Sequence, residues 1–154
     1  MRSGGEAVFT IDTSVYINAL NLQEAGSQES HAFLQYVSHH PLPVFSPTLL
    51  LVELYAAAAH IWGTGQAEDI VQAVRGLPGQ MWIPLDENWA EESGRVAAQH
   101  HLRGSDAVYA AVALHYGATL ITLDRQQLER LQSAMPVQTP AEASNNLRKG
   151  QNGS

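Results

Sequence analysis

Four acidic side chains stand at positions from which they could bind a divalent metal ion. Asp12 and Asp124 each follow a short apolar run directly, Asp106 opens a long apolar stretch, and Glu53 is a lone acid among leucines and a valine. An unpaired carboxylate in surroundings as apolar as those of Glu53 costs several kcal/mol. Oxygen-only ligand sets suit Mg²⁺ or Mn²⁺. The joint pattern therefore predicts a metal site built from these acids.

Each aspartate also has a simpler interpretation as a helix N-cap. An Asp at a loop-to-helix junction commonly caps the helix, and Asp124 has Gln127 three residues later, in capping-box spacing. On this interpretation, Glu53 is a partly exposed residue on the flank of its helix. The metal site is favoured because the uncompensated acids would repel one another, and the only lysine, Lys149, lies in the polar C-terminal stretch.

The elements that must position these acids alternate between strands and helices. Runs with strand character cover residues 7–11, 43–45, 81–84, 119–122 and 136–138. Helix candidates run from Asp12 to Leu20 and over 28–39, 48–61, 66–75, 86–101, 106–116 and 124–131. Two of them, 48–61 and 106–116, are apolar around most of their circumference, so we expect both to be largely buried.

This alternation predicts the α/β class, as a three-layer α/β/α sandwich around a short central parallel sheet of four to five strands. In such folds ligands bind beyond the carboxyl ends of the strands, near the point where the strand order reverses. Asp12 and Asp124 each follow a predicted strand, which places them at that edge.

A length of 154 residues fits one domain, which we assign to residues 1–140, followed by a flexible polar tail over 141–154. The chain has no cysteine, which excludes a disulfide scaffold, a zinc-thiolate finger and a thiol nucleophile. Without a folded lysine, a P-loop and Schiff-base catalysis are also excluded. We find no signal peptide and no apolar run long enough to cross a membrane, and we expect a soluble cytoplasmic protein.

Two further patterns are not interpreted as sites. The doublets His39-His40 and His100-His101 cannot chelate a metal from one helix face, because adjacent helical residues point about 100° apart. We expect them at the surface or at helix ends. Residues 63–65, Gly-Thr-Gly, lack the third glycine of a dinucleotide fingerprint and follow a helix, so they are interpreted as a helix break.

Four segments together resemble the motifs of PIN-domain nucleases. They are Val8–Ser14, Glu53 in the helix after Ser46-Pro47, Gly104–Ala113 and Gly117–Arg125. The order and the elements match, and the resemblance extends from residue 7 to about residue 139. Within the family, the chain is most similar to the single-domain VapC-type toxins of bacterial toxin–antitoxin pairs.

The resemblance implies a metal-dependent endoribonuclease. Its one or two Mg²⁺ or Mn²⁺ ions would be held by Asp12, Glu53, Asp106 and Asp124, which are the implied catalytic residues. The ions would activate water and stabilise the leaving oxygen of the RNA phosphodiester. All four carboxylates would have to converge within a few ångströms. The resemblance also implies inhibition by a cognate protein antitoxin and a homodimer.

Neighbouring polar residues complete the implied site. Ser14 and Thr122 match the side chains that such sites place beside the metals, where they would orient a carboxylate or a water. Arg103 and Arg125 flank two of the acids, so they are candidate contacts to the RNA phosphates. Each of these arginines has an equal alternative as the surface ion-pair partner of an acid.

The net charge of −7 alone would argue against a nucleic-acid ligand. Bound divalent ions change that balance, so acidity does not exclude RNA as a substrate. The alternative function is a catalytically inactive PIN-like module that binds RNA or protein, and Mn²⁺ binding discriminates the two. An aspartyl-phosphate receiver or phosphatase is disfavoured by the missing folded lysine.

Overall fold

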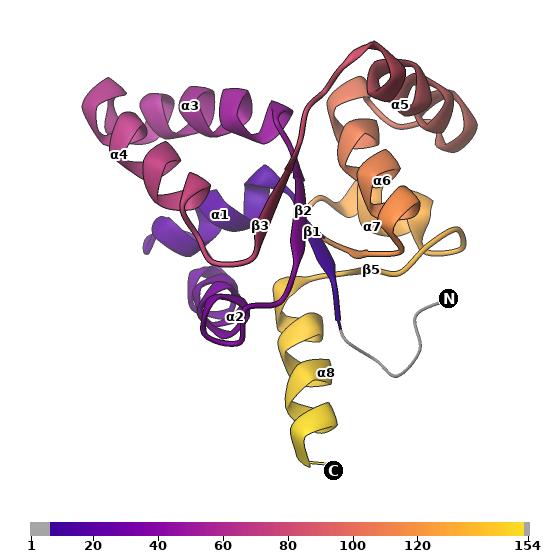
Figure 1. Cartoon of the computed structure of the whole chain (residues 1–154). Coiled ribbons are helices and arrows are strands. Elements are labelled where there is room, and N and C mark those ends of the chain that lie inside the picture. The colour runs from indigo at the N-terminus through magenta and orange to yellow at the C-terminus, as the bar shows by residue number, and fades with distance from the viewer. Residues whose placement is uncertain (1–6, 153–154) are drawn as a thin grey trace.

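A five-stranded parallel sheet forms the centre of the molecule (Figure 1). The computed structural model describes residues 7–152. The strand order is β3-β2-β1-β4-β5. Their bounds are β1 Phe9–Ile11, β2 Val44–Pro47, β3 Gln80–Ile83, β4 Thr119–Ile121 and β5 Val137–Gln138. The predicted parallel sheet is confirmed, and its order reverses between β1 and β4.

Helices cover both faces of this sheet, which confirms the three layers. In Figure 1, α1 to α4 lie on one side of the strands and α5 to α7 on the other. The bounds of these helices are α1 Thr13–Leu20, α2 Ser27–His39, α3 Leu49–Trp62, α4 Thr64–Arg75, α5 Glu87–His100, α6 Gly104–Tyr116 and α7 Arg125–Leu131. Over residues 7–152, no helix combines the length and the apolar character that a membrane crossing needs.

The register of β1 against β4 brings two chain segments level at the carboxyl edge of the sheet. Phe9 pairs with Thr119 and Ile11 with Ile121. The backbone N–H of Asp12 then donates to the carbonyl oxygen of Ile121 at 2.9 Å. Residues directly after the two strands therefore lie beside one another at the point where the strand order reverses, which is where α/β folds bind ligands.

The two apolar helices differ in burial. Helix α6 is buried around most of its circumference, as predicted, because it packs against both the sheet and α5. The prediction for α3 was wrong: of its residues, all of which the structure describes, only Leu50, Leu54 and Ala58 are buried. Val52 is 64% exposed. The i, i+4, i+8 spacing of the buried residues shows the reason, since a single stripe of α3 faces the interior.

The C-terminal segment also differs from the prediction of a flexible tail over 141–154. Helix α8, Pro140–Asn152, packs against α2 and β5. A capping box begins it: the backbone N–H of Thr139 donates to Glu142 Oε1 at 3.0 Å, and that of Glu142 donates to Thr139 Oγ1 at 3.2 Å. Ala143 is buried and Leu147 packs against the core. The narrow apolar stripe explains why the polar composition suggested a tail.

Residues 1–6 and 153–154 lie outside the described range. The prediction that no signal peptide is present concerns residues 1–6 in part. The last two residues of the predicted tail are 153–154.

Candidate functional site

Asp12 lies at the carboxyl end of β1 and is 7% exposed. Its Oδ2 accepts hydrogen bonds from Ser14 Oγ at 2.7 Å and from Thr122 Oγ1 at 3.1 Å. Asp12 is the N-cap residue of α1, but its side chain makes no capping hydrogen bond. The simpler interpretation as a helix cap is therefore wrong for Asp12, whose carboxylate instead joins the end of β1 to the segment after β4.

The same hydroxyl groups tie the two segments together. The backbone N–H of Leu123 donates to Ser14 Oγ at 3.2 Å, and that of Asp124 donates to Thr122 Oγ1 at 3.0 Å. Thr122 is fully buried. The structure thus places Ser14 and Thr122 directly against Asp12, where they hold one orientation of its carboxylate.

Glu53 is held by a tyrosine and a threonine from two other helices. Its Oε1 accepts from Tyr109 Oη at 2.5 Å and from Thr13 Oγ1 at 2.8 Å, and the two hydroxyl oxygens are 2.7 Å apart. Tyr109 is fully buried. Burial and the charge of Glu53 raise the pKa of Tyr109 far above its ordinary value, so it stays a protonated donor.

Sequence reasoning missed Tyr109. The signal was present, because Tyr109 follows Asp106 by three residues on α6 and such residues share a helix face. The sequence around Tyr109 does not show that this helix face contacts Glu53, which lies 56 positions earlier in the chain.

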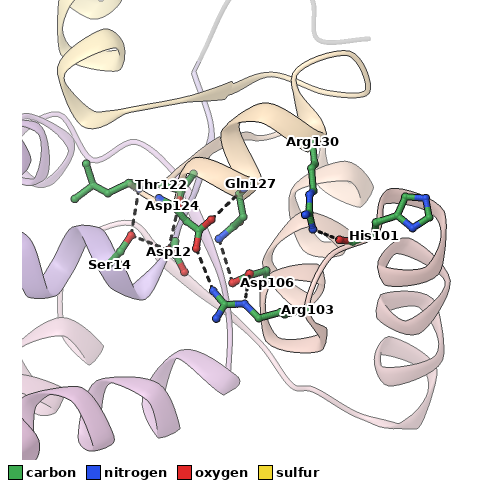
Figure 2. A network of polar contacts seen from close by, with 10 residues as sticks. Asp12, Ser14, His101, Arg103, Asp106, Thr122, Asp124, Gln127 and Arg130 are labelled. Carbon is green, nitrogen blue, oxygen red and sulfur yellow. Dashed lines mark hydrogen bonds and ion pairs between the residues drawn. The ribbon is translucent and has the colours of Figure 1, made fainter.

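Arg103 lies between Asp106 and Asp124 (Figure 2). Its Nε donates to Asp106 Oδ2 at 3.2 Å, and its Nη2 donates to Asp124 Oδ2 at 3.2 Å. The side chain of Arg103 is 69% exposed. The arginine that we predicted as a phosphate contact thus compensates two carboxylates here, which is the ion-pair alternative. Arg125 is exposed at the start of α7 and, within residues 7–152, forms no ion pair.

The other two aspartates differ in their relation to helix caps. Asp124 Oδ1 accepts from the backbone N–H of Gln127 at 3.1 Å, which confirms Asp124 as the N-cap of α7. Asp106 lies in the first turn of α6, whose N-cap is Arg103. Its Oδ1 accepts from Nε2 of the fully buried Gln127 at 3.3 Å. Sequence reasoning weighed Gln127 only for capping and missed this contact.

The acids influence one another electrostatically. Burial raises the pKa of Asp12 above its ordinary value, and the charges of Glu53 and Asp106 raise it further. The hydrogen bonds that Asp12 accepts act in the opposite direction. Burial likewise raises the pKa of Asp106, Arg103 lowers it, and the charges of Asp124 and Glu53 raise it. The site is therefore a region of excess negative charge.

The predicted convergence of all four carboxylates is not seen in this arrangement. Among residues 7–152, no three His, Asp or Glu side chains lie close enough together to hold one ion. The physical reason is that each acid is turned toward a partner within the protein. These partners are Ser14 and Thr122 for Asp12, Thr13 and Tyr109 for Glu53, Arg103 and Gln127 for Asp106, and Arg103 for Asp124.

The patterns set aside in the sequence behave as expected. His39 and His40 span the C-terminal end of α2, and His100 and His101 span that of α5. Gly63 separates α3 from α4, which confirms a helix break there, whereas Thr64 and Gly65 of the predicted break already belong to α4.

Three solved structures illustrate the similarity of the fold. The VapC20 toxin of Mycobacterium tuberculosis, described as cleaving the sarcin–ricin loop, matches with a TM-score of 0.67 and 16% identity over 82% of this chain and 95% of that one. VapBC2 of Rickettsia felis, bound to promoter DNA, matches with a TM-score of 0.65 and 13% identity over 86% of this chain and 98% of that one. FitAcB of Neisseria gonorrhoeae matches with a TM-score of 0.63 and 20% identity over 86% of this chain and 97% of that one.

Comparison with curated protein sequences gave no match. The family model described as PIN domain matches residues 9–132, which is most of the chain and includes all four acids. With this match and the shared fold, the chain belongs to the PIN domain family.

Proposed function

We propose that this protein is a divalent metal-dependent endoribonuclease and the toxin of a type II toxin–antitoxin pair. The observation that carries the proposal is that Asp12 and Asp124 follow neighbouring strands where the strand order reverses, and that the charges of Glu53 and Asp106 act on Asp12, as those of Asp124 and Glu53 act on Asp106. Burial first, and then the charges of neighbouring acids, raise the pKa values of Asp12 and Asp106, and such perturbed groups are common at functional sites.

The residues present fit a hard divalent cation. Their donor atoms are carboxylate oxygens, which Mg²⁺ and Mn²⁺ prefer, and the mutual repulsion of the acids would be relieved by positive charge. Asp12, Glu53, Asp106 and Asp124 would hold the ion or ions. When bound, the metal supplies Lewis acidity that activates water and stabilises charge on the phosphodiester.

The chain's own residues then have distinct roles. Ser14 and Thr122 keep the Asp12 carboxylate in one orientation, and Thr13 and Tyr109 do the same for Glu53. Fixed orientations lower the entropy that the site must lose when it binds a ligand.

The two arginines supply positive charge for the RNA backbone. Arg103 is exposed enough to exchange its carboxylate partners for an RNA phosphate. Arg125 is the first residue of α7 and directly follows Asp124.

A protein antitoxin and a second copy of the chain are the proposed partners. The neighbours in structure include toxin–antitoxin complexes. The described surface also carries apolar side chains that a partner would cover, such as Leu22 at 80%, Val52 at 64% and Met81 at 51% exposure.

Metal dependence is the direct test of the proposed function. We expect purified protein to cleave RNA with Mg²⁺ or Mn²⁺, to lose cleavage in excess EDTA, and to recover it when the metal is restored. Calorimetry with Mn²⁺ alone provides a second measurement. Cleavage that persists in excess EDTA would contradict the proposal, and absence of Mn²⁺ binding would favour the inactive binding module.

Arg103 allows a test that separates metal from substrate. We expect Arg103→Gln to bind Mn²⁺ several-fold more tightly, because a competing cation is removed from Asp106 and Asp124. RNA cleavage at saturating Mn²⁺ should nevertheless fall, since a phosphate contact is lost.

Arg95→Gln is the matched control for this experiment. Arg95 is 67% exposed and also pairs with two acids, Glu91 and Glu92, but on α5. Neither measurement should change in this variant. Unchanged Mn²⁺ affinity in Arg103→Gln would show that Arg103 does not compete with the metal.

A further inference from the structure

Gln127 is a fully buried polar side chain that contacts the acidic site from α7. Its Nε2 donates to Asp106 Oδ1 at 3.3 Å, and its backbone N–H donates to Asp124 Oδ1 at 3.1 Å. One buried residue thereby touches two of the four acids. The backbone contact is the ordinary N-cap bond of α7 and any residue except proline could make it, so it does not explain why a glutamine side chain is buried here.

The other end of the same side chain has no partner. Gln127 Oε1 is buried and, within the part of the chain that the structure describes, accepts no hydrogen bond. A buried amide oxygen without a donor is costly, and native proteins rarely keep one without a functional reason or a bound water. An apolar side chain of similar size would fill the space without that cost, so the amide must be retained for something that it binds.

The direction of the amide follows from Asp106. Turning the amide over would place Oε1 against Asp106 Oδ1, oxygen against oxygen, and would repel an ionised carboxylate. With Nε2 toward Asp106, Oε1 is forced to the unpartnered position. The contact to the carboxylate therefore decides the orientation of the amide.

Asp106 is held from both sides by donors of different character. Arg103 binds Oδ2 from the solvent side and its side chain is 69% exposed, whereas Gln127 binds Oδ1 and is fully buried (Figure 2). Arg103 can leave when another cation arrives, because water replaces its contacts. Gln127 is enclosed in the interior, so a cation that arrives from solvent does not reach its side chain to displace it.

We propose that Gln127 is the positioning residue for Asp106 in metal binding, with Nε2 fixing the carboxylate. The proposal rests on the proposed function and names a residue of that same site.

Replacement of Gln127 by Met tests this role. We expect Gln127→Met to weaken Mn²⁺ binding about 10- to 100-fold by calorimetry, the usual effect of losing a residue that orients a metal ligand. The melting temperature in EDTA should change little, because the hydrogen bond to Asp106 and the unpartnered oxygen are removed together and their effects oppose one another. Gln127→Leu is the second variant in case methionine packs poorly, and Gln126→Met, at the neighbouring exposed glutamine, is the control.

A second arm checks that the effect passes through Asp106. In an Asp106→Asn background, Gln127→Met should cause no further loss of Mn²⁺ affinity, whereas an additive loss would overturn the proposal. A lower melting temperature with unchanged Mn²⁺ affinity would also overturn it and leave Gln127 a purely structural residue. The outcome is separate from that of the proposed function: wild-type protein that binds Mn²⁺ but cleaves no RNA contradicts only the nuclease, while wild-type protein that binds no Mn²⁺ overturns both.

Discussion

Replacement of Asp12 by Asn is expected to reduce metal-dependent RNA cleavage by more than about 100-fold, because residues that merely orient a metal ligand already cost about 10- to 100-fold when lost. Asn keeps the shape and one acceptor for Ser14 and Thr122, but it removes the negative charge that a metal would bind. Initial rates of RNA cleavage over a range of Mg²⁺ concentrations provide the measurement.

The same substitution has an opposite effect on stability without metal. Because burial raises the folded-state pKa of Asp12 above its ordinary 3.8, the folded protein binds more protons than the unfolded chain between those two values. This contribution to stability is present at low pH and is lost as the pH rises through the raised pKa. At neutral pH in EDTA, Asp12→Asn should therefore melt no lower than the wild type.

Asp86→Asn is the matched control for both measurements. Asp86 also precedes a helix, but it caps α5 by accepting from the backbone N–H of Trp89 at 2.9 Å, away from the acidic site. Asn caps as well as Asp, so neither cleavage nor melting temperature should change. A clear drop in the melting temperature of Asp12→Asn in EDTA would instead show that the charged form stabilises the fold.

Replacement of Tyr109 by Phe is expected to weaken Mn²⁺ binding and RNA cleavage by about 10- to 100-fold. The phenol donates to Glu53 Oε1, and its loss leaves Thr13 as the remaining donor to that oxygen among residues 7–152. Glu53 would then be free to take several orientations. Calorimetry with Mn²⁺ measures this change directly, and cleavage rates at saturating Mn²⁺ show how much of the loss comes from binding.

Tyr55→Phe provides the comparison for Tyr109→Phe. The Tyr55 hydroxyl also donates to a glutamate, Glu68, at 2.9 Å, but at the surface between α3 and α4. We expect no change in Mn²⁺ affinity in this variant. Equal behaviour of the two variants would show that the Tyr109 hydroxyl has no role in the acidic site.

Local sequence signals predicted the secondary structure closely. The predicted helices 28–39 and 66–75 correspond to α2 at Ser27–His39 and α4 at Thr64–Arg75, since periodicity and breaking residues are properties of short windows. The signal for α8 was equally local, because Thr139 and Glu142 form a capping box and Pro140 stands at the first helical position, but the polar composition of the segment was given more weight. That miss was one of interpretation.

The exposed face of α3 could not be predicted in the same way. Its sequence is apolar on nearly every side, yet only the stripe of Leu50, Leu54 and Ala58 is buried among its residues, all of them described. Burial depends on what packs against each face, and a helix window carries no information about its neighbours. The sequence of α6 is similarly apolar, and there the sheet and α5 do cover it.

For the site, the sequence by itself determined which acids stand at strand ends and helix starts, because Asp12 and Asp124 directly follow their strands. Only the tertiary structure decided their partners. The contacts of Glu53 with Tyr109 and of Asp106 with Gln127 join residues 56 and 21 positions apart, and the two oxygens of Asp106 are shared between an exposed arginine and a buried amide. Such pairings follow from strand order and helix packing, which bring distant segments together and which no local pattern of residues records.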